Sequence, residues 1–396
     1  MLLGASFIDR VGGTMIWPFF ALYVTRKFGV GMTEAGVLLG IFSLAGVAGN
    51  MAGGALTDRL GRRNIVLFGL VFSALSSLVM GLLDNLAAFY ILAAVVGFLG
   101  DIAGPAHAAM VADLLPESQR NEGFGLLRVV GNLAWLVGPT LGGALATRSY
   151  LYLFIGDAVT SLITAAIVYR FIPETRPEPN AGEKPSSLWD TAKGYRWVLA
   201  DGLYMAFLLA SMLMLVVYQQ MYSTLSVFLR DVHGLPERQW GLLLSLDAAM
   251  VVLFQFWVAR RIRPYPPMLM MALGTAFYLV GFTMYGFVSG YPLFVLAILI
   301  ITVGEMIQMP VSQALAARFA PEEMRGRYMA FFNLSWTIPA TVGPAAAGLV
   351  MDNFDPRWVW YAAGILSAVA AVSFLLLQVA TRRRFAPAVE PTSVWS

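Results

Sequence analysis

The sequence GALTDRLGRR, residues 54–63, lies between two long apolar runs at about 33–56 and 64–83. A charged segment this short, between two helices long enough to cross a bilayer, predicts a tight loop at a membrane surface. Arginine accumulates in loops on the cytoplasmic side of membranes. We therefore expect a cytoplasmic loop, because the segment holds Arg59, Arg62 and Arg63.

Two glycines and one aspartate give this loop a definite geometry. Gly54 and Gly61 allow a close approach between helices and a sharp turn. Asp58 lies where the preceding helix ends, and the helix dipole makes a carboxylate unfavourable there. We expect Asp58 to find a cation or the N-terminus of another helix as its partner.

The order and spacing of these residues resemble the signature loop between the second and third helices of the major facilitator superfamily, G-x-L-x-D-R-x-G-R-R. In that family the loop latches the two halves together on the cytoplasmic side when the transporter faces outward. The alternative for the loop is an ordinary positive-inside loop. The alternative for its acidic partner, Asp113, is a solvated charge at the end of a helix. The resemblance implies a latch made of Gly54, Asp58, Arg59, Gly61, Arg62 and Arg63, with Asp113 as acidic partner.

The composition is that of a membrane protein with almost no soluble part. Of 396 residues, 59% are hydrophobic and 12% are charged, against about 25% charged in soluble domains. The net charge of +3 is spread over short loops and does not indicate nucleic-acid binding. With no cysteine and two histidines we expect no metal site. Without a phosphate-binding loop or a soluble segment of domain length, we expect no enzyme and no cofactor.

Twelve apolar runs are each long enough to form a membrane-spanning helix. The first begins at Leu2, is too long for a signal-peptide core and lacks a small-residue cleavage site. We expect it to be retained as a helix. Whether a short leader precedes it stays an open question. The runs are about 2–25, 33–56, 64–83, 86–113, 121–146, 149–172, 199–229, 238–259, 267–288, 291–318, 325–350 and 357–380.

Basic residues are distributed unevenly between alternate loops. Eighteen of the 26 lysines and arginines fall on the side of residues 54–63 and six on the other side. The remaining two, Arg10 and Arg128, lie inside apolar runs. This bias predicts a multi-pass protein of the inner (cytoplasmic) membrane with both termini in the cytoplasm.

The chain divides into two similar halves. Residues 173–198 are rich in Pro, Glu, Gly and Ser, which suits a flexible linker between bundles at 1–172 and 199–380, with a cytoplasmic tail at 381–396. We expect an all-α membrane protein with the major facilitator fold, twelve helices in two pseudo-symmetric bundles and a substrate site at midplane. A duplication with an offset of 205 is indicated because Pro105, Pro116, Glu117, Arg120, Gly138, Pro139 and Gly143 match Pro310, Pro321, Glu322, Arg325, Gly343, Pro344 and Gly348.

The fifth run resembles the family's antiporter motif, G-x8-G-x3-G-P-x2-G-G, except that Ala134 replaces the middle glycine. Small residues and a proline kink let another helix pack closely and pivot, although ordinary small-residue packing is the alternative. The fourth run departs from the family's proton antiporters, since Ala93 stands where they carry an arginine, and this weakens a coupling mechanism taken from them. The residues expected in gating contacts are Gly125, Gly138, Pro139, Gly142 and Gly143.

Seven charged residues are expected within the membrane, where each is costly without a partner or a watery cavity. We expect Asp9 to pair with Arg128 near His107, and Asp101 to face Glu305 across the central cavity. Whether each carboxylate titrates or is held by an arginine stays open, and Asp157 reaching the outer interface is a further alternative. We assign proton coupling to Glu305, Asp101, Asp247 and Asp9, and embedded ion pairing to Arg10, Arg128 and Asp157.

Aromatic, methionine and amide side chains in the first and seventh runs suit a site for lipophilic ligands, although core or lipid-facing packing is the alternative. The residues are Trp17, Tyr218, Gln219, Tyr222 and Met212. The resemblance implies a monomeric transporter that exports lipophilic or cationic molecules by alternating access, driven by a proton gradient. The alternatives are a facilitator or symporter of a sugar, peptide or other metabolite, and a non-transporting sensor or lipid-handling protein.

Overall fold

The computed structural model describes residues 1–175, 196–382 and 384–385, and these residues form helices and short connections without a strand. Eleven helical segments are long and apolar enough to cross a membrane. The remaining expected segment, at 2–25, is covered by two shorter helices with a 3-10 turn between them. The linker expected at 173–198 and the tail at 381–396 fall largely outside the described residues.

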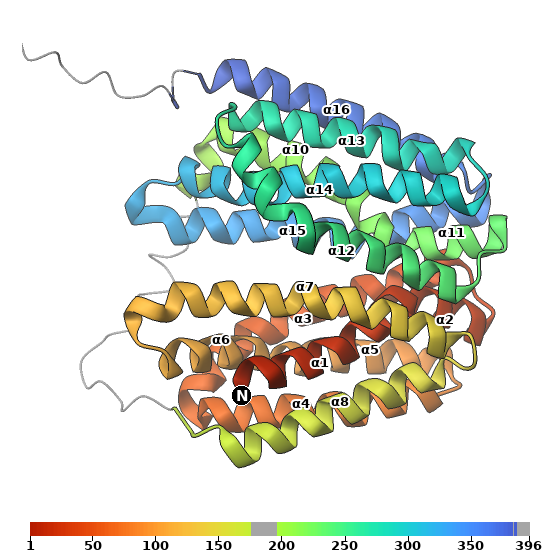
Figure 1. Cartoon of the computed structure of the whole chain (residues 1–396), viewed down its shortest axis with the longest axis vertical. Helices are drawn as coiled ribbons and strands as arrows, with labels where there is room; N and C mark the ends of the chain where they lie inside the picture. Colours follow the sequence, from red (N-terminus) through yellow and green to blue (C-terminus); the bar gives the residue numbers. More distant parts are fainter. Residues whose placement is uncertain (176–195, 383, 386–396) are drawn as a thin grey trace, which may run out of the picture.

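The N-terminal half holds the helices drawn from red to yellow in Figure 1. They are α1 (Leu2–Ile16), η1 (Trp17–Phe19), α2 (Phe20–Phe28), α3 (Met32–Leu60), α4 (Arg62–Leu82), α5 (Leu86–Asp101), α6 (Ala103–Leu114), η2 (Glu117–Gln119), α7 (Arg120–Ala146) and α8 (Leu151–Phe171).

The C-terminal half, green to blue, lies above it in the same view. Its elements are α10 (Gly202–Gln219), η3 (Gln220–Tyr222), α11 (Thr224–His233), α12 (Glu237–Ile262), α13 (Pro267–Phe287), α14 (Tyr291–Phe319), η4 (Glu322–Met324), α15 (Arg325–Asn353) and α16 (Trp358–Ala380).

The repeat seen in the sequence is also present in the helix boundaries. Four pairs of helices, α3 and α12, α4 and α13, α5 and α14, α7 and α15, begin 205 residues apart. The glycines that end α2 and α11, Gly29 and Gly234, are separated by the same number and both have positive φ, at 63° and 65°. This left-handed conformation ends a helix, and glycine adopts it without the steric cost that a Cβ would bring. The halves therefore share a local plan as well as a fold.

Three expected helices are interrupted, each for a local reason. Pro18 lies in η1 between α1 and α2. Pro105 has no N–H to bond the carbonyl of Asp101, so the run expected at 86–113 breaks between α5 and α6. The run expected at 199–229 breaks at η3, where Ser223 leaves helical geometry with φ −126° and ψ −79°.

The halves meet through α3 against α15 and through α7 against α12. We call the end that carries Arg62, Arg170, Arg260 and Arg318 the basic end, and the end that carries Gly31, Glu237 and Asp352 the opposite end. Helices α2 and α11 lie at the opposite end, on the right in Figure 1. Among the described residues, the hydrogen bonds that join the halves lie between midplane and this opposite end.

The end of the chain is anchored at the basic end of the C-terminal half. Arg384 donates two hydrogen bonds to the carboxylate of Asp201, at 2.8 and 2.7 Å. Asp201 also accepts from the Tyr204 N–H at 3.2 Å and the Tyr328 hydroxyl at 3.0 Å. Burial raises the pKa of Asp201, but these hydrogen bonds outweigh it, so that the pKa lies below the usual aspartate value.

Candidate functional site

Three adjoining cavities lie between the halves, and they share lining residues. The Trp17 lobe, of about 330 Å³, is lined by Trp17, Phe42 and Asp101 among others. The Arg128 lobe, of about 800 Å³, belongs to the N-terminal half, and the Glu305 lobe, of about 310 Å³, lies mainly against the C-terminal half. The three lobes form one central cavity because each pair of lobes shares lining residues. The Trp17 and Glu305 lobes share Trp17, Gln219 and Tyr222, the Trp17 and Arg128 lobes share Gly100 and Asp101, and the Arg128 and Glu305 lobes share Asn132 and Trp135.

Two of the three interrupted helices, those broken at η1 and η3, deliver aromatic and amide side chains to this cavity. Trp17 begins η1 and is 43% exposed, which for a tryptophan lining a cavity means that its ring borders open space. Tyr222 ends η3, and its ring packs against Trp135 of the other half with centroids 5.1 Å apart. The hydroxyls of Tyr218 and Tyr222 are 3.0 Å apart. Trp17, Tyr218, Gln219 and Tyr222 thus line the cavity, and their role in binding a substrate stays a prediction.

Met212, predicted in the same wall, is not among the lining residues of these lobes. It precedes Tyr218 by six residues, which rotates it about 120° away around the helix. Sequence reasoning missed Trp135 and Trp336, which close the aromatic wall of the Glu305 lobe. Each is a lone tryptophan in the middle part of a membrane helix, and this position in the sequence could have identified both as cavity-lining residues.

The Glu305 lobe brings together two carboxylates from different helices. Asp247 of α12 is 5% exposed and accepts a hydrogen bond from Thr302 at 2.6 Å. Glu305 of α14 lines the same lobe, and its Oε2 is buried without a hydrogen-bond partner among the described residues. Among the residues that the structure describes, no basic side chain lines this lobe. Two carboxylates in an aromatic pocket attract a cation or a proton.

The Arg128 lobe gathers charges of both signs from α1, α6 and α7. Asp9, Arg10, His107 and Arg128 all line it, so the three residues expected near one another, Asp9, His107 and Arg128, border the same space. His107 hydrogen bonds to Ser6 at 3.0 Å. The expected ion pair between Asp9 and Arg128 is not formed, since no contact within 4 Å joins them among the described residues.

Asp9 instead turns towards α8. It accepts a hydrogen bond from Ser161 at 3.3 Å, and Asp157 lies nearby, 6% exposed and hydrogen bonded to Ser77. The prediction that Asp157 belongs to an ion pair with arginine is therefore wrong, because its described neighbours are hydroxyls and a second carboxylate. Within the described part of the chain, no group of three or more His, Asp or Glu side chains is placed to hold a metal ion.

Asp101 and Glu305 do not line a common lobe. Asp101 lies where the Trp17 and Arg128 lobes meet, and its carboxylate crowds the position that a Cβ of Gly46 would occupy. It is therefore held against α3 in the N-terminal half. Trp17 and Tyr222 separate it from the Glu305 lobe, so the two carboxylates lie on either side of an aromatic partition.

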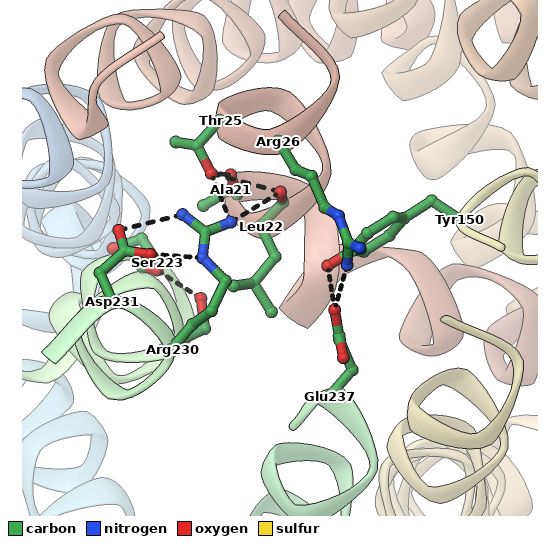
Figure 2. Close-up of polar contacts among 10 residues, drawn as sticks. Ala21, Leu22, Thr25, Arg26, Tyr150, Ser223, Arg230, Asp231 and Glu237 are labelled. Atoms are coloured by element: carbon green, nitrogen blue, oxygen red, sulfur yellow. Dashed lines mark hydrogen bonds and ion pairs between the residues drawn. The ribbon is translucent and has the colours of Figure 1, made fainter. Parts of the chain in front are cut away.

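The opposite end is closed by a polar cluster that the sequence did not reveal (Figure 2). Glu237 of α12 accepts hydrogen bonds from Arg26 and from Tyr150, each at 2.9 Å. Arg230 of α11 donates to the carbonyl of Leu22 at 3.3 Å and the hydroxyl of Thr25 at 3.0 Å. In the sequence these residues resembled ordinary loop charges, because their partners are 87 to 211 positions away.

A second polar contact closes the same end. Asp352, near the end of α15, accepts hydrogen bonds from the N–H groups of Met32 and Thr33 at 2.9 and 2.7 Å, and from the Thr33 hydroxyl at 2.5 Å. A carboxylate of one half thus caps the first turn of α3 in the other. A Cβ at Gly31 would displace the Asp352 carboxylate from this position.

The small residues of α7 serve two different contacts. A Cβ on Gly138 would collide with Thr14, and one on Gly142 would meet the Met15 carbonyl at 2.6 Å, so this pair packs against α1 within the same half. Gly143 faces the other half, where a Cβ would lie 2.7 Å from the Glu237 carbonyl, and Pro139 meets Gly241 there. Gly125 touches nothing within 4 Å of its missing Cβ, so its predicted packing role is not seen.

The signature loop is held within the N-terminal half. Arg62 forms an ion pair with Asp113, and the N–H of Arg62 donates to Glu174 at 2.8 Å. Arg63 donates to the Tyr169 carbonyl. Gly61 has φ +90°, which allows the turn between α3 and α4, whereas a Cβ on Gly54 would meet nothing within 4 Å. The side chains of Asp58 and Arg59 lie outside the described residues, so their latch role stays a prediction.

Comparison with known proteins agrees with this arrangement. A family model described as Major Facilitator Superfamily matches residues 2–340 and 270–396. The chain is 27% identical to the MFS-type transporter YttB of Bacillus subtilis, covering 95% of this chain and 94% of the relative. It is 25% identical to a Na(+), Li(+), K(+)/H(+) antiporter of Planococcus maritimus (94% and 92%) and 23% identical to the multidrug resistance protein MdtH of Escherichia coli (97% and 95%).

Solved structures share the fold at low identity. A mutant of the nucleoside transporter NupG superposes with a TM-score of 0.82 at 14% identity, covering 95% of this chain and 98% of NupG. A POT family transporter gives a TM-score of 0.77, also at 14% identity, covering 98% and 96%.

Proposed function

Because the chain belongs to the major facilitator superfamily of secondary transporters, we propose that it exports lipophilic organic cations in exchange for protons. The observation that carries this proposal is the Glu305 lobe, where Asp247 and Glu305 lie in an aromatic pocket that no basic side chain of the described part of the chain lines. Aromatic faces and carboxylates together recognise an organic cation. The names of two relatives, a multidrug resistance protein and a cation/proton antiporter, agree with this class of transport.

Protons and cations would compete for this carboxylate pair. A buried carboxylate without a cation is costly in a membrane, and Glu305 has an oxygen that no described group satisfies. We propose that the pair holds a proton when the substrate is absent and releases it when the cation enters. A sensor or lipid-handling protein on the same fold has no need of unpaired carboxylates at midplane, which favours coupled transport over those alternatives.

The basic end is proposed to face the cytoplasm, in agreement with the unequal distribution of lysine and arginine. Since the contacts between halves lie towards the opposite end, the structure then corresponds to an inward-facing state. Both termini would be cytoplasmic in a protein of the cytoplasmic membrane. Alternation would require the opposite-end contacts to break and the loop at 54–63 to join the halves.

The decisive experiment is transport in proteoliposomes with an imposed pH gradient, screened over cationic dyes, drugs and sugars. Glu305→Gln should abolish uphill transport and preserve downhill exchange, since it mimics the protonated carboxyl. Proton release on adding the transported cation to detergent-solubilised protein should fall in the same variant. Equal release from wild type and Glu305→Gln would move the coupling role to Asp247 or Asp101. Transport of sugars alone would instead support the facilitator alternative.

A second candidate function, exchange of inorganic cations for protons, is favoured by the pair Asp9 and Asp157. Their carboxylates lie near one another among the hydroxyls of Ser73, Ser77 and Ser161. Hard monovalent cations prefer such oxygen ligands. Sodium- or lithium-driven proton movement in vesicles that is lost in Asp157→Asn but kept in Glu305→Gln would support this function. Loss in neither variant would exclude the pair.

A further inference from the structure

The two ends of the central cavity differ in charge, and from this we infer that the substrate is a zwitterion whose oxyanion group binds Arg10 and Arg128. Its cationic group would occupy the Glu305 lobe, so the inference rests on the proposed cation site and adds a second recognition point. Carboxylate, sulfonate and phosphate share the required chemistry. The Arg128 lobe is about 800 Å³, which leaves room for such a group and its waters.

The two arginines approach each other from neighbouring helices. Arg10 belongs to α1, yet its Nη1 lies 3.6 Å from the position that a Cβ of Gly131 would take on α7. Gly131 follows Arg128 by three residues, so the two share one face of α7. The absence of a side chain at Gly131 leaves this space to the guanidinium of Arg10. Two guanidinium groups are thereby gathered at one wall of the lobe.

Neither guanidinium is held in a direct ion pair by a described residue, although Asp9 of the same lobe interacts electrostatically with Arg10 over a longer distance. Within the described residues, Arg10 and Arg128 form no ion pair within 4 Å, and both are exposed to the cavity that they line. Of the two acidic residues that line the lobe, Asp9 accepts a hydrogen bond from Ser161, and the carboxylate of Asp101 lies beside Gly46. An arginine inside a membrane protein without a carboxylate partner is costly unless it serves a ligand or pathway.

The chemistry of guanidinium suits an oxyanion better than any other partner. Its planar fork donates two parallel hydrogen bonds to a carboxylate or phosphate. His107, hydrogen bonded to Ser6, and Asn132 line the same lobe and add polar groups. The opposite charges in the Glu305 lobe would repel the same oxyanion, so the cavity fixes the direction in which a zwitterion lies.

Trp135 separates the two charged regions. It lines both the Arg128 and the Glu305 lobes, and its ring contacts Tyr222 across the halves. Trp135 follows Arg128 by seven residues, about 10 Å along the helix axis. A ligand that satisfies both ends therefore carries an aromatic or aliphatic body between charges separated by roughly that distance. Simple organic cations would use only the Glu305 lobe.

The test compares two dyes that differ in one charge, rhodamine B with a free carboxylate and its ethyl ester, which is a cation only. Affinity is measured by fluorescence anisotropy on the purified full chain. Rhodamine B should bind wild type at least about tenfold more tightly than the ester, a difference of about 1.4 kcal/mol. Arg128→Gln and Arg10→Gln should remove this preference and leave ester binding unchanged, which also shows that the variants are folded.

Two controls make the outcome specific. Arg120→Gln removes a charge from the exposed start of the same helix and should leave both affinities as in wild type. Arg128→Lys should restore part of the preference, since a point charge replaces the planar fork. Equal binding of the two dyes to wild type, or a preference that survives both glutamine variants, overturns the inference while ester binding still supports the cation site. If neither dye binds, the proposed function fails as well.

Discussion

Asp352 caps the helix that begins beside Thr33, although 319 positions of the sequence separate the two residues. The carboxylate belongs to one half of the transporter and the capped helix α3 to the other. Separating the halves at this end would leave the first N–H groups of α3 without an acceptor from the protein. The contact therefore stabilises the state that is closed at the opposite end.

Asp352→Ala should shift the protein towards the state that is open at the opposite end. Losing a helix cap costs about 0.5–2 kcal/mol, which corresponds to about a 2- to 30-fold change in the population ratio. Spin labels at Arg148→Cys and Phe354→Cys, one in each half of this cysteine-free chain, report the distance. Asp352→Asn should behave closer to wild type because it keeps an acceptor. Asp84→Asn, which breaks an ion pair within one half, is the control. An unchanged distribution in Asp352→Ala would contradict the capping role.

Glu237→Gln should have a smaller effect on the same equilibrium. Its partner Arg26 is 64% exposed in its side chain, and exposed ion pairs contribute about 0.2–1 kcal/mol. The population ratio should change by less than about fivefold, and the difference from wild type should vanish at high salt. The same label pair measures this. A larger, salt-independent shift would mean that Glu237 acts through Tyr150 instead.

Gly143→Ala should force α7 away from α12, because a Cβ would lie 2.7 Å from the backbone carbonyl of Glu237. The expected result is reduced closure at the opposite end and slower transport in a protein that still folds. Gly125→Ala is the matched control on the same helix, since nothing lies within 4 Å of its added carbon. Wild-type transport by Gly143→Ala would show that the helices can separate at no cost.

The contact between Asp201 and Arg384 should weaken only in acid. The pKa of Asp201 is lower in the folded protein, so its contribution to stability is complete above the ordinary aspartate pKa of about 3.9. It is lost as the pH falls through the lowered value. A spin label at Arg382→Cys, an exposed position two residues before Arg384, should therefore gain mobility below about pH 4. In Asp201→Asn the label should be as mobile at neutral pH as it is in acid in the wild type. A label whose mobility does not change in this variant would show that the contact between Asp201 and Arg384 does not anchor the end of the chain.

Much of the fold could be predicted from local patterns. Apolar runs set the helices, and the loop at 54–63 together with the repeat pointed to the family. Prolines at 18 and 105 mark two of the interruptions, but the break at Ser223 has no proline, and no short-range rule identifies it. Boundaries were generally right to within a few residues, because the membrane fixes helix length.

The site was harder to predict, because pairing between distant helices depends on rotation about their axes. The sequence led us to expect Asp9 to meet Arg128 near His107, and these three residues line one lobe. Depth does not state which way a side chain turns, and Asp9 turned to Ser161 rather than to Arg128. The closing contacts of Glu237 and Asp352 join positions more than 200 residues apart, beyond the reach of reasoning from neighbours.

Two of the three interrupted helices break at η1 and η3, and these two turns form joints between the central cavity and the closed end. Trp17 and Tyr222 lie in η1 and η3 on the cavity wall, while α2 and α11 continue from these turns to the closed end. The carbonyl of Pro18, within the first joint, accepts a hydrogen bond from Trp240 of the other half at 3.1 Å. A molecule that binds against the joints touches the same backbone that closes the protein. Any difference in its affinity for straight and bent joints then enters the opening equilibrium directly, as thermodynamic linkage requires.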